Sequence, residues 1–111
     1  MANYKHAHLE SEILNLLNHT IKHEVYDEVL KHCSFTSVKL SPDNSLAIVY
    51  VDTYDRSKIE AMIEKLMHAK GLFRNQLAHY MNIRKIPDIR FVGDTSIDNS
   101  LKIDKLLDKI H

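Results

Sequence analysis

The sequence contains little cysteine and glycine, and each shortage excludes a class of site. Its 111 residues include one cysteine, Cys33, which excludes an internal disulfide and a Cys-x-x-Cys zinc or redox motif. The only glycines are Gly71 and Gly93, so a Gly-rich phosphate loop and a Gly-x-Ser-x-Gly nucleophile motif are also excluded. We therefore expect a reduced, cytosolic setting and no flexible linker within the chain.

Long apolar stretches and an excess of one charge are missing as well. The longest apolar run is residues 46–51, whereas a membrane-spanning helix needs about 20 residues. The first twenty residues show no basic start followed by an apolar run, so we expect no signal peptide. With 44% hydrophobic and 27% charged residues, the composition is typical of one globular domain, which we expect to span residues 1–111.

Fifteen basic and fifteen acidic side chains balance overall, but they are unevenly distributed. Residues 1–64 hold six basic and ten acidic side chains, and residues 94–111 hold three and four. Residues 65–93 hold six basic side chains against a single acid, Asp88. This positive block is a candidate phosphate-binding surface, although a solvated basic face explains it equally well. Its cations are Lys65, Lys70, Arg74, Arg84, Lys85 and Arg90.

Hydrophobic periodicity predicts a first helix and then a hairpin. Apolar residues recur every three or four positions from residue 7 to residue 30, which predicts a helix; a break near His23 is the alternative. Two runs rich in β-formers follow at residues 35–40 and 46–54. The Ser-Pro-Asp-Asn-Ser sequence between them is strong turn chemistry, so the two runs predict a β-hairpin.

Two helices joined at a break are expected after the hairpin. Asp55 or Ser57 can cap the first of these helices. The break falls at residues 69–71, where Gly71 suits a left-handed helix end. The apolar positions expected to face the core in the second helix are Phe73, Leu77, Tyr80 and Met81.

A third strand and a final helix complete the predicted order. Pro87 ends the helical pattern, and Ile89, Phe91 and Val92 then predict a third strand. Residues 94–96, Asp-Thr-Ser, are expected to cap a last helix. The order α-β-β-α-α-β-α predicts an α+β fold with helices packed on one face of a three-stranded sheet. The apolar stripe of the last helix consists of Ile103, Leu106, Leu107 and Ile110.

The break between the middle helices is the most informative candidate site. Lys70 lies at the break and Arg74 follows one turn later, where the N-terminus of a helix also attracts phosphate. Asn75 and His79 are expected on the surface opposite the core. The alternative is that Gly71 only ends a helix and that the cations serve solubility.

No catalytic or metal-binding constellation is visible. His19 and His23 have the i, i+4 spacing of a metal-ligand pair, but no third ligand is placed beside them, so we expect solvated histidines. Cys33 follows His32, yet neighbours in sequence do not form a nucleophile–base pair. We therefore predict a protein that is not an enzyme and that has no metal or other cofactor.

Three segments resemble the ribosome-binding factor A family. Residues 38–51 (VKLSPDNSLAIVYV) are similar to its hairpin, and residues 69–77 (AKGLFRNQL) to its helix–kink–helix. Residues 83–91 (IRKIPDIRF) with 94–97 (DTSI) resemble its last strand and the start of its final helix. These segments occur in the family's order and with matching spacing, within a resemblance that covers about residues 35–107.

The resemblance implies a type II KH-like fold. An Ala-x-Gly kink, here Ala69 to Gly71, takes the place of the Gly-x-x-Gly loop with which ordinary KH domains clamp nucleotides. It also implies a non-enzymatic role, namely association with the free small ribosomal subunit, late maturation of its rRNA and growth in the cold. The chain departs from the family in its longer segment before the first strand and in its neutral charge.

On this basis we expect a cytoplasmic, monomeric protein that contacts phosphates of small-subunit rRNA. The rival prediction is a protein–protein adaptor that touches no RNA. The residues expected to bind RNA are Lys70, Arg74, Asn75, His79, Arg84, Lys85 and Arg90.

Overall fold

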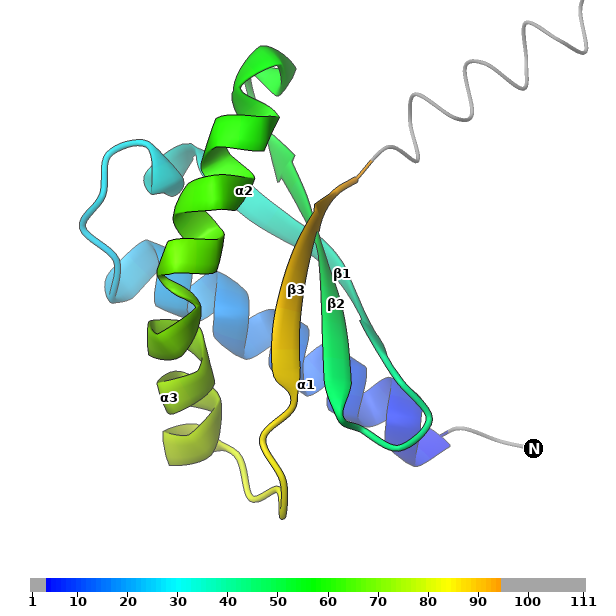
Figure 1. The fold of residues 1–111 in the computed structure, drawn as a ribbon. Helices are drawn as coiled ribbons and strands as arrows, with labels where there is room; N and C mark the ends of the chain where they lie inside the picture. Colours follow the sequence, from blue (N-terminus) through cyan, green and yellow to red (C-terminus); the bar gives the residue numbers. More distant parts are fainter. Residues whose placement is uncertain (1–3, 95–111) are drawn as a thin grey trace, which may run out of the picture.

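Helix α1 (Tyr4–His23) opens residues 4–94, the part of the chain described by the computed structural model (Figure 1). The prediction that this helix runs to residue 30 is wrong, and the structure has the alternative break instead. Beyond the helix, the Asp27 carboxylate accepts a hydrogen bond from the Val29 backbone N–H at 2.8 Å. Such a local side-chain contact competes with helical hydrogen bonds, so the chain turns here.

The predicted hairpin is formed by β1 (Cys33–Leu40) and β2 (Leu46–Thr53), which pair antiparallel. A short 3-10 turn, η1 (Leu30–His32), leads into it. Helix α1 satisfies the outer edge of β1, because the Asn18 side chain accepts from the Phe35 N–H at 2.9 Å and donates to the Phe35 carbonyl at 3.0 Å. The edge strand is thereby fixed to the helix that covers it.

The hairpin turn is held by its own side chains. The Asp43 carboxylate accepts hydrogen bonds from the Ser41 hydroxyl at 2.8 Å, the Ser45 hydroxyl at 2.7 Å and the Ser45 N–H at 3.1 Å. These donors stabilise the charged form and lower the pKa of Asp43 to about 2. Asn44 adopts a left-handed conformation with φ of 61°, which asparagine tolerates well. The turn chemistry read from the sequence is therefore confirmed.

A short turn follows the hairpin and leads into the two predicted helices. Asp55 caps the turn η2 (Arg56–Lys58), since its carboxylate accepts from the Ser57 N–H at 3.1 Å and the Ser57 hydroxyl at 2.6 Å. Helix α2 (Ile59–His68) continues directly from it, and α3 (Lys70–Tyr80) follows after a single residue.

Two expectations for α3 are wrong. Gly71 does not take a left-handed conformation, because Ala69 makes the break (φ −91°, ψ 7°) and its N–H still bonds back into α2. Tyr80 is 63% exposed instead of facing the core. It is the last helical residue, and the chain is already extended at Met81, so the buried stripe ends one turn earlier, at Leu77.

Strand β3 (Asp88–Gly93) pairs with β2 in parallel and gives the sheet order β1-β2-β3 (Figure 1). Its alternation buries Ile89 and Phe91 and leaves Arg90 exposed. The three-stranded sheet is therefore mixed, with β1 and β3 at its edges. The pairing sets Arg90 beside Ile48 of β2.

The helices pack on one face of the sheet, as expected. Phe73 of α3 meets Phe35 of β1 and Phe91 of β3, with the three ring centroids 5.5–5.7 Å apart. Buried side chains of α1 and α2 complete the same core. They are Ile13 and Leu17 from α1, and Met62 and Leu66 from α2.

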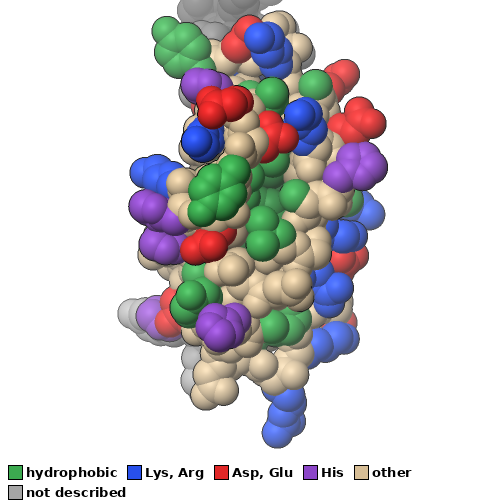
Figure 2. Space-filling model, turned by 90° about the vertical axis from the view of Figure 1, so that its left-hand side faces the viewer, with side chains coloured by type: hydrophobic (Ala, Val, Ile, Leu, Met, Phe, Trp, Pro, Cys, Tyr) green, Lys and Arg blue, Asp and Glu red, His purple; other side chains and the backbone are tan. Residues whose placement is uncertain are grey.

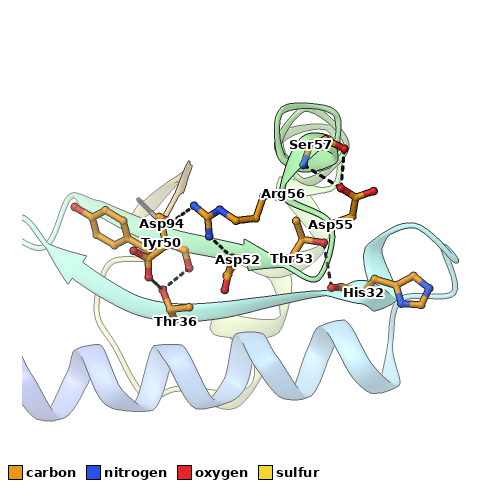
Figure 3. A network of polar contacts seen from close by, with 9 residues as sticks. All are labelled: His32, Thr36, Tyr50, Asp52, Thr53, Asp55, Arg56, Ser57 and Asp94. Carbon is orange, nitrogen blue, oxygen red and sulfur yellow. Dashed lines mark hydrogen bonds and ion pairs between the residues drawn. The ribbon is translucent and has the colours of Figure 1, made fainter. Parts of the chain in front are cut away.

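The carboxyl end of β3 is fastened by a polar network (Figure 3). Arg56 donates to the Asp52 carboxylate and to the Asp94 carbonyl, each at 2.8 Å. The Thr36 hydroxyl donates to the Asp94 carboxylate at 2.6 Å.

The predicted final helix lies outside the described residues. No helix within residues 4–94 is long and apolar enough to cross a membrane.

Candidate nucleic-acid interface

The kink between α2 and α3 exposes backbone. A Cβ built on Gly71 would meet no atom within 4 Å, so this glycine is not required by packing inside the protein. Its position in the first turn of α3 places the partial positive charge of a helix N-terminus beside it. A ligand backbone can therefore approach closely at this point.

Lys70 connects the kink to the start of β3. Its Nζ lies 3.1 Å from Oδ1 of Asp88, and the two side chains are 31% and 56% exposed. This hydrogen bond is the main cause that lowers the pKa of Asp88, with the Ile89 N–H adding to it. Lys70 was predicted to contact phosphate, but the ion pair with Asp88 neutralises part of its charge.

Arg74 also connects α3 to the chain before β3. Its Nε donates to the Pro87 carbonyl at 3.2 Å, and its Nη2 donates to the Ile86 carbonyl at 3.3 Å. These acceptors are neutral, so the guanidinium keeps its full charge. A guanidinium has five N–H donors, and those that remain can contact a phosphate.

Arg84 and Lys85 lie on the loop between α3 and β3. Both are exposed, and among residues 4–94 neither makes a hydrogen bond or an ion pair. They line a cavity of about 400 Å³ between this loop, α1 and the hairpin turn, which contributes Asp43 and Asn44. These two cations are thus available to an anionic ligand.

Arg90 lies on the face of the sheet that no helix of residues 4–94 covers. It is exposed and pairs in register with Ile48, whose partner on β1 is Lys39. Neighbouring strands lie about 4.8 Å apart, so the Cα atoms of Lys39 and Arg90 are roughly 10 Å apart across β2. Lys39 was not among the residues predicted to bind RNA, because only the parallel pairing of β2 with β3 brings it opposite Arg90.

Asn75 and His79 are exposed on α3, as expected. The His79 ring packs edge-on against the ring of Tyr80, with centroids 4.5 Å apart. The seven predicted residues therefore do not form one cluster. They follow the kink, the outer side of α3, the following loop and β3. Figure 2 shows Lys and Arg side chains spread down the right-hand edge of this view.

The candidate interface can recognise a ligand by its charge and its shape. Among the described residues, no group of side chains is arranged for acid–base or metal chemistry. Burial raises the pKa of the Cys33 thiol to about 11, so it is a poor nucleophile at neutral pH. The rings of His19 and His23 lie 4.4 Å apart on the surface of α1. Within residues 4–94, no group of three His, Cys, Asp or Glu side chains is placed to hold a metal.

Known proteins resemble this chain over nearly its whole length. A family model described as ribosome-binding factor A matches residues 5–107. Ribosome-binding factor A of Mycoplasma pneumoniae is 39% identical over 110 residues, which cover 99% of this chain and 95% of the relative.

Solved structures give the same result for the fold. A putative ribosome-binding factor A from Thermotoga maritima superposes with a TM-score of 0.73 at 32% identity, covering 88% of this chain and 94% of that one. A homology model of the Thermus thermophilus protein, fitted into the cryo-EM map of its 30S complex, gives 0.64 at 23% identity, covering 81% and 96%. Structures of this family have a KH-like fold, which confirms the predicted fold class. From its match to the family model and its identity to these relatives, this chain belongs to the ribosome-binding factor A family, which comprises ribosome-binding factors and is not a known class of enzymes.

Proposed function

We propose that this protein binds the free small ribosomal subunit in the cytoplasm and assists the late maturation of its rRNA. The observation that carries the proposal is the family match across residues 5–107. The Thermus thermophilus relative, whose model was fitted into a map of a 30S complex, supports the small subunit as the particle that is bound.

The basic surface is the part of the protein that we assign to rRNA. Arg84, Lys85, Arg90 and Lys39 supply exposed cations on the loop and on the open face of the sheet. Lys70, Arg74, Asn75 and His79 add contacts along the kink and α3. Phosphate contacts position a protein without reading sequence, so selectivity comes from the shape of the folded rRNA.

The mechanism is a shift between rRNA conformations. A rigid surface that fits one arrangement of the subunit better than another favours that arrangement by the difference between its two affinities. Chemistry by the protein is not needed for such a role. Cleavage of the precursor rRNA, including its 5′ end, is left to nucleases that act on the favoured conformation.

The test is co-sedimentation of the protein with free small subunits, large subunits and intact ribosomes at several salt concentrations. We expect binding to free small subunits alone. If four cations contact phosphate, the affinity falls roughly 50- to 150-fold between 50 and 200 mM salt. Binding that does not depend on salt would favour the protein–protein adaptor, and binding to no ribosomal particle would contradict the proposal.

In cells, depletion of the protein is expected to leave small-subunit rRNA unprocessed at its 5′ end, more strongly in the cold. Primer extension on rRNA from depleted cells measures this directly. Normal 5′ ends at low temperature would separate subunit binding from maturation and contradict the second half of the proposal.

A further inference from the structure

A groove runs between α2 and the segment that joins α1 to β1, residues 24–32. It contains two hollows, one of about 410 Å³ that includes Val29 and Met62, and one of about 460 Å³ that includes Tyr26 and Leu72. Apart from His68, the lining residues between positions 58 and 72 recur every three or four positions, so both hollows lie along one side of α2 and its continuation. These residues are Lys58, Met62, Lys65, Ala69 and Leu72. We call this surface the α2 groove.

Apolar side chains at the α2 groove remain exposed to solvent. Tyr54 is 97% exposed and Tyr26 is 82% exposed, and Val29 is 37% exposed. Figure 2 looks onto this side of the molecule and shows hydrophobic side chains gathered over its centre, among acidic, basic and histidine side chains. Exposed aromatic rings beside apolar hollows are typical of surfaces that bind other proteins.

The charge of the α2 groove is opposite to that of the basic surface. Four carboxylates and two lysines line its hollows, which gives a net charge of −2 with the histidines neutral. Two of these carboxylates are already paired within the protein, because Lys65 Nζ lies 3.2 Å from Oδ2 of Asp27 across the groove and Lys31 Nζ lies 3.7 Å from Oε1 of Glu28. Such a surface repels phosphate and attracts cations. Apart from Asp27, the carboxylates are Glu24, Glu28 and Asp55.

We propose that the α2 groove binds a basic, amphipathic segment of a partner polypeptide. Apolar side chains of that segment occupy the two hollows, and its Lys or Arg side chains lie against Glu24 and compete with Lys31 for the exposed carboxylate of Glu28. The lining from Met62 to Leu72 spans roughly 15 Å along the helix axis, the length of four to five extended residues. A short linear segment is therefore sufficient to reach both hollows.

The α2 groove and the basic surface lie on either side of the kink. Ala69 lines the second hollow, whereas the next residue, Lys70, turns away to Asp88 at the start of β3. Successive helical residues point about 100° apart, which explains how adjacent positions serve different surfaces. RNA and a polypeptide can therefore be bound at the same time.

The test uses ¹⁵N-labelled full-length protein and three defined probes followed by NMR. The probes are a 12-residue peptide of leucine and lysine, the same peptide with glutamate in place of lysine, and a 12-nucleotide oligouridylate. We expect the Lys–Leu peptide to shift amides of residues 24–32 and 58–69. The glutamate peptide is expected to leave them unchanged, and the RNA is expected to shift residues 70–74 and 84–90 instead.

Two variants assign the binding to the α2 groove. Tyr26→Ser combined with Val29→Ser is expected to weaken the Lys–Leu peptide at least tenfold. Tyr80→Ser is the matched control, because Tyr80 is 63% exposed and lines neither hollow. Circular dichroism checks that both variants fold. Glu24→Lys combined with Glu28→Lys provides a second, charge-based variant, which should also weaken the peptide.

Three results would overturn the proposal. The first is equal binding of the glutamate peptide, and the second is peptide binding that persists in the groove variants. The third concerns residues 95–111: if deleting them shifts the amides of residues 24–32 in the free protein, the α2 groove holds the protein's own C-terminal segment. None of these results depends on whether the protein binds the small subunit.

Discussion

At the scale of single residues, the hairpin turn shows how one carboxylate organises a loop. Asp43 accepts hydrogen bonds from Ser41 and Ser45, and these donors lower its pKa to about 2. A carboxylate with a depressed native pKa stabilises the fold above its unfolded pKa of about 3.9. Most of that contribution is lost as the pH falls from about 4 to 2, and the rest is lost below pH 2.

We therefore predict that Asp43→Asn lowers the melting temperature at pH 7, because the amide is a weaker acceptor than the carboxylate. At pH 2 the difference in melting temperature should shrink to a small part of its value at pH 7, since Asp43 is then about half protonated in the folded protein and almost fully protonated in the unfolded chain. Thermal melts followed by circular dichroism at both pH values measure this. Glu64→Gln, at an exposed position of α2, is the control. An unchanged difference at pH 2 would show that the charge is irrelevant.

Gly71 is a surface residue that we expect to matter for binding and not for packing. Because a Cβ there meets open space and the backbone is helical, Gly71→Ala is expected to keep or slightly raise stability. The added methyl group should nevertheless weaken binding to small subunits if the rRNA backbone approaches at the kink. Melting temperature and co-sedimentation separate the two effects. Ala78→Gly, an exposed position on the same helix, should instead cost about 0.5–1 kcal/mol of stability and leave binding intact.

At the scale of elements, the kink and β3 are joined by the cations that were expected to bind RNA. Lys70 pairs with Asp88, and Arg74 bonds two carbonyls of the preceding loop. Exposed ion pairs contribute about 0.2–1 kcal/mol, so this pair positions the elements more than it stabilises them.

Removing the acidic partner should separate these roles. Asp88→Asn is expected to tighten binding to small subunits several-fold, because it raises the net charge of the basic surface and releases Lys70. Stability should fall by less than about 1 kcal/mol. Binding isotherms and urea melts provide the two readings. Weaker binding by a stable Asp88→Asn protein would mean that Lys70 acts only as a structural side chain.

Local signals predicted the elements well where they were strong. The turn at residues 41–45 and the cap at Asp55 rest on side-chain chemistry, and the structure confirms both. The end of α1 was misjudged because apolar residues continue with helical spacing through Val25, which is buried although it is not helical. Tyr80 was misjudged because periodicity does not tell where a helix leaves the core.

The arrangement of the candidate site depended on contacts that are distant in sequence. Nothing local indicates that β3 pairs in parallel with β2, yet this pairing alone brings Lys39 and Arg90 together across Ile48. The α2 groove could likewise not be predicted from the sequence, since its two sides come from residues 24–32 and 53–72. Residue types could be predicted from the sequence, but their neighbours could not.

At the scale of the whole molecule, a neutral total conceals two surfaces of opposite character. The basic surface follows α3, the next loop and β3, whereas the α2 groove is acidic and partly apolar. A protein without net charge gains little from long-range attraction to RNA, so binding depends on cations that are locally concentrated. This arrangement suits a factor that recognises a particle made of both RNA and protein.

We propose that cations of the basic surface hold small-subunit rRNA, and the salt dependence of binding tests this most directly. Dissociation constants for free small subunits are measured from 50 to 300 mM salt for the original protein, Arg84→Glu and Lys22→Glu. Both variants change the charge equally at exposed positions. Arg84→Glu should bind about tenfold more weakly and reduce the salt slope by about 1, while Lys22→Glu changes neither. Equal effects of the two variants, or none from Arg84→Glu, would contradict the account.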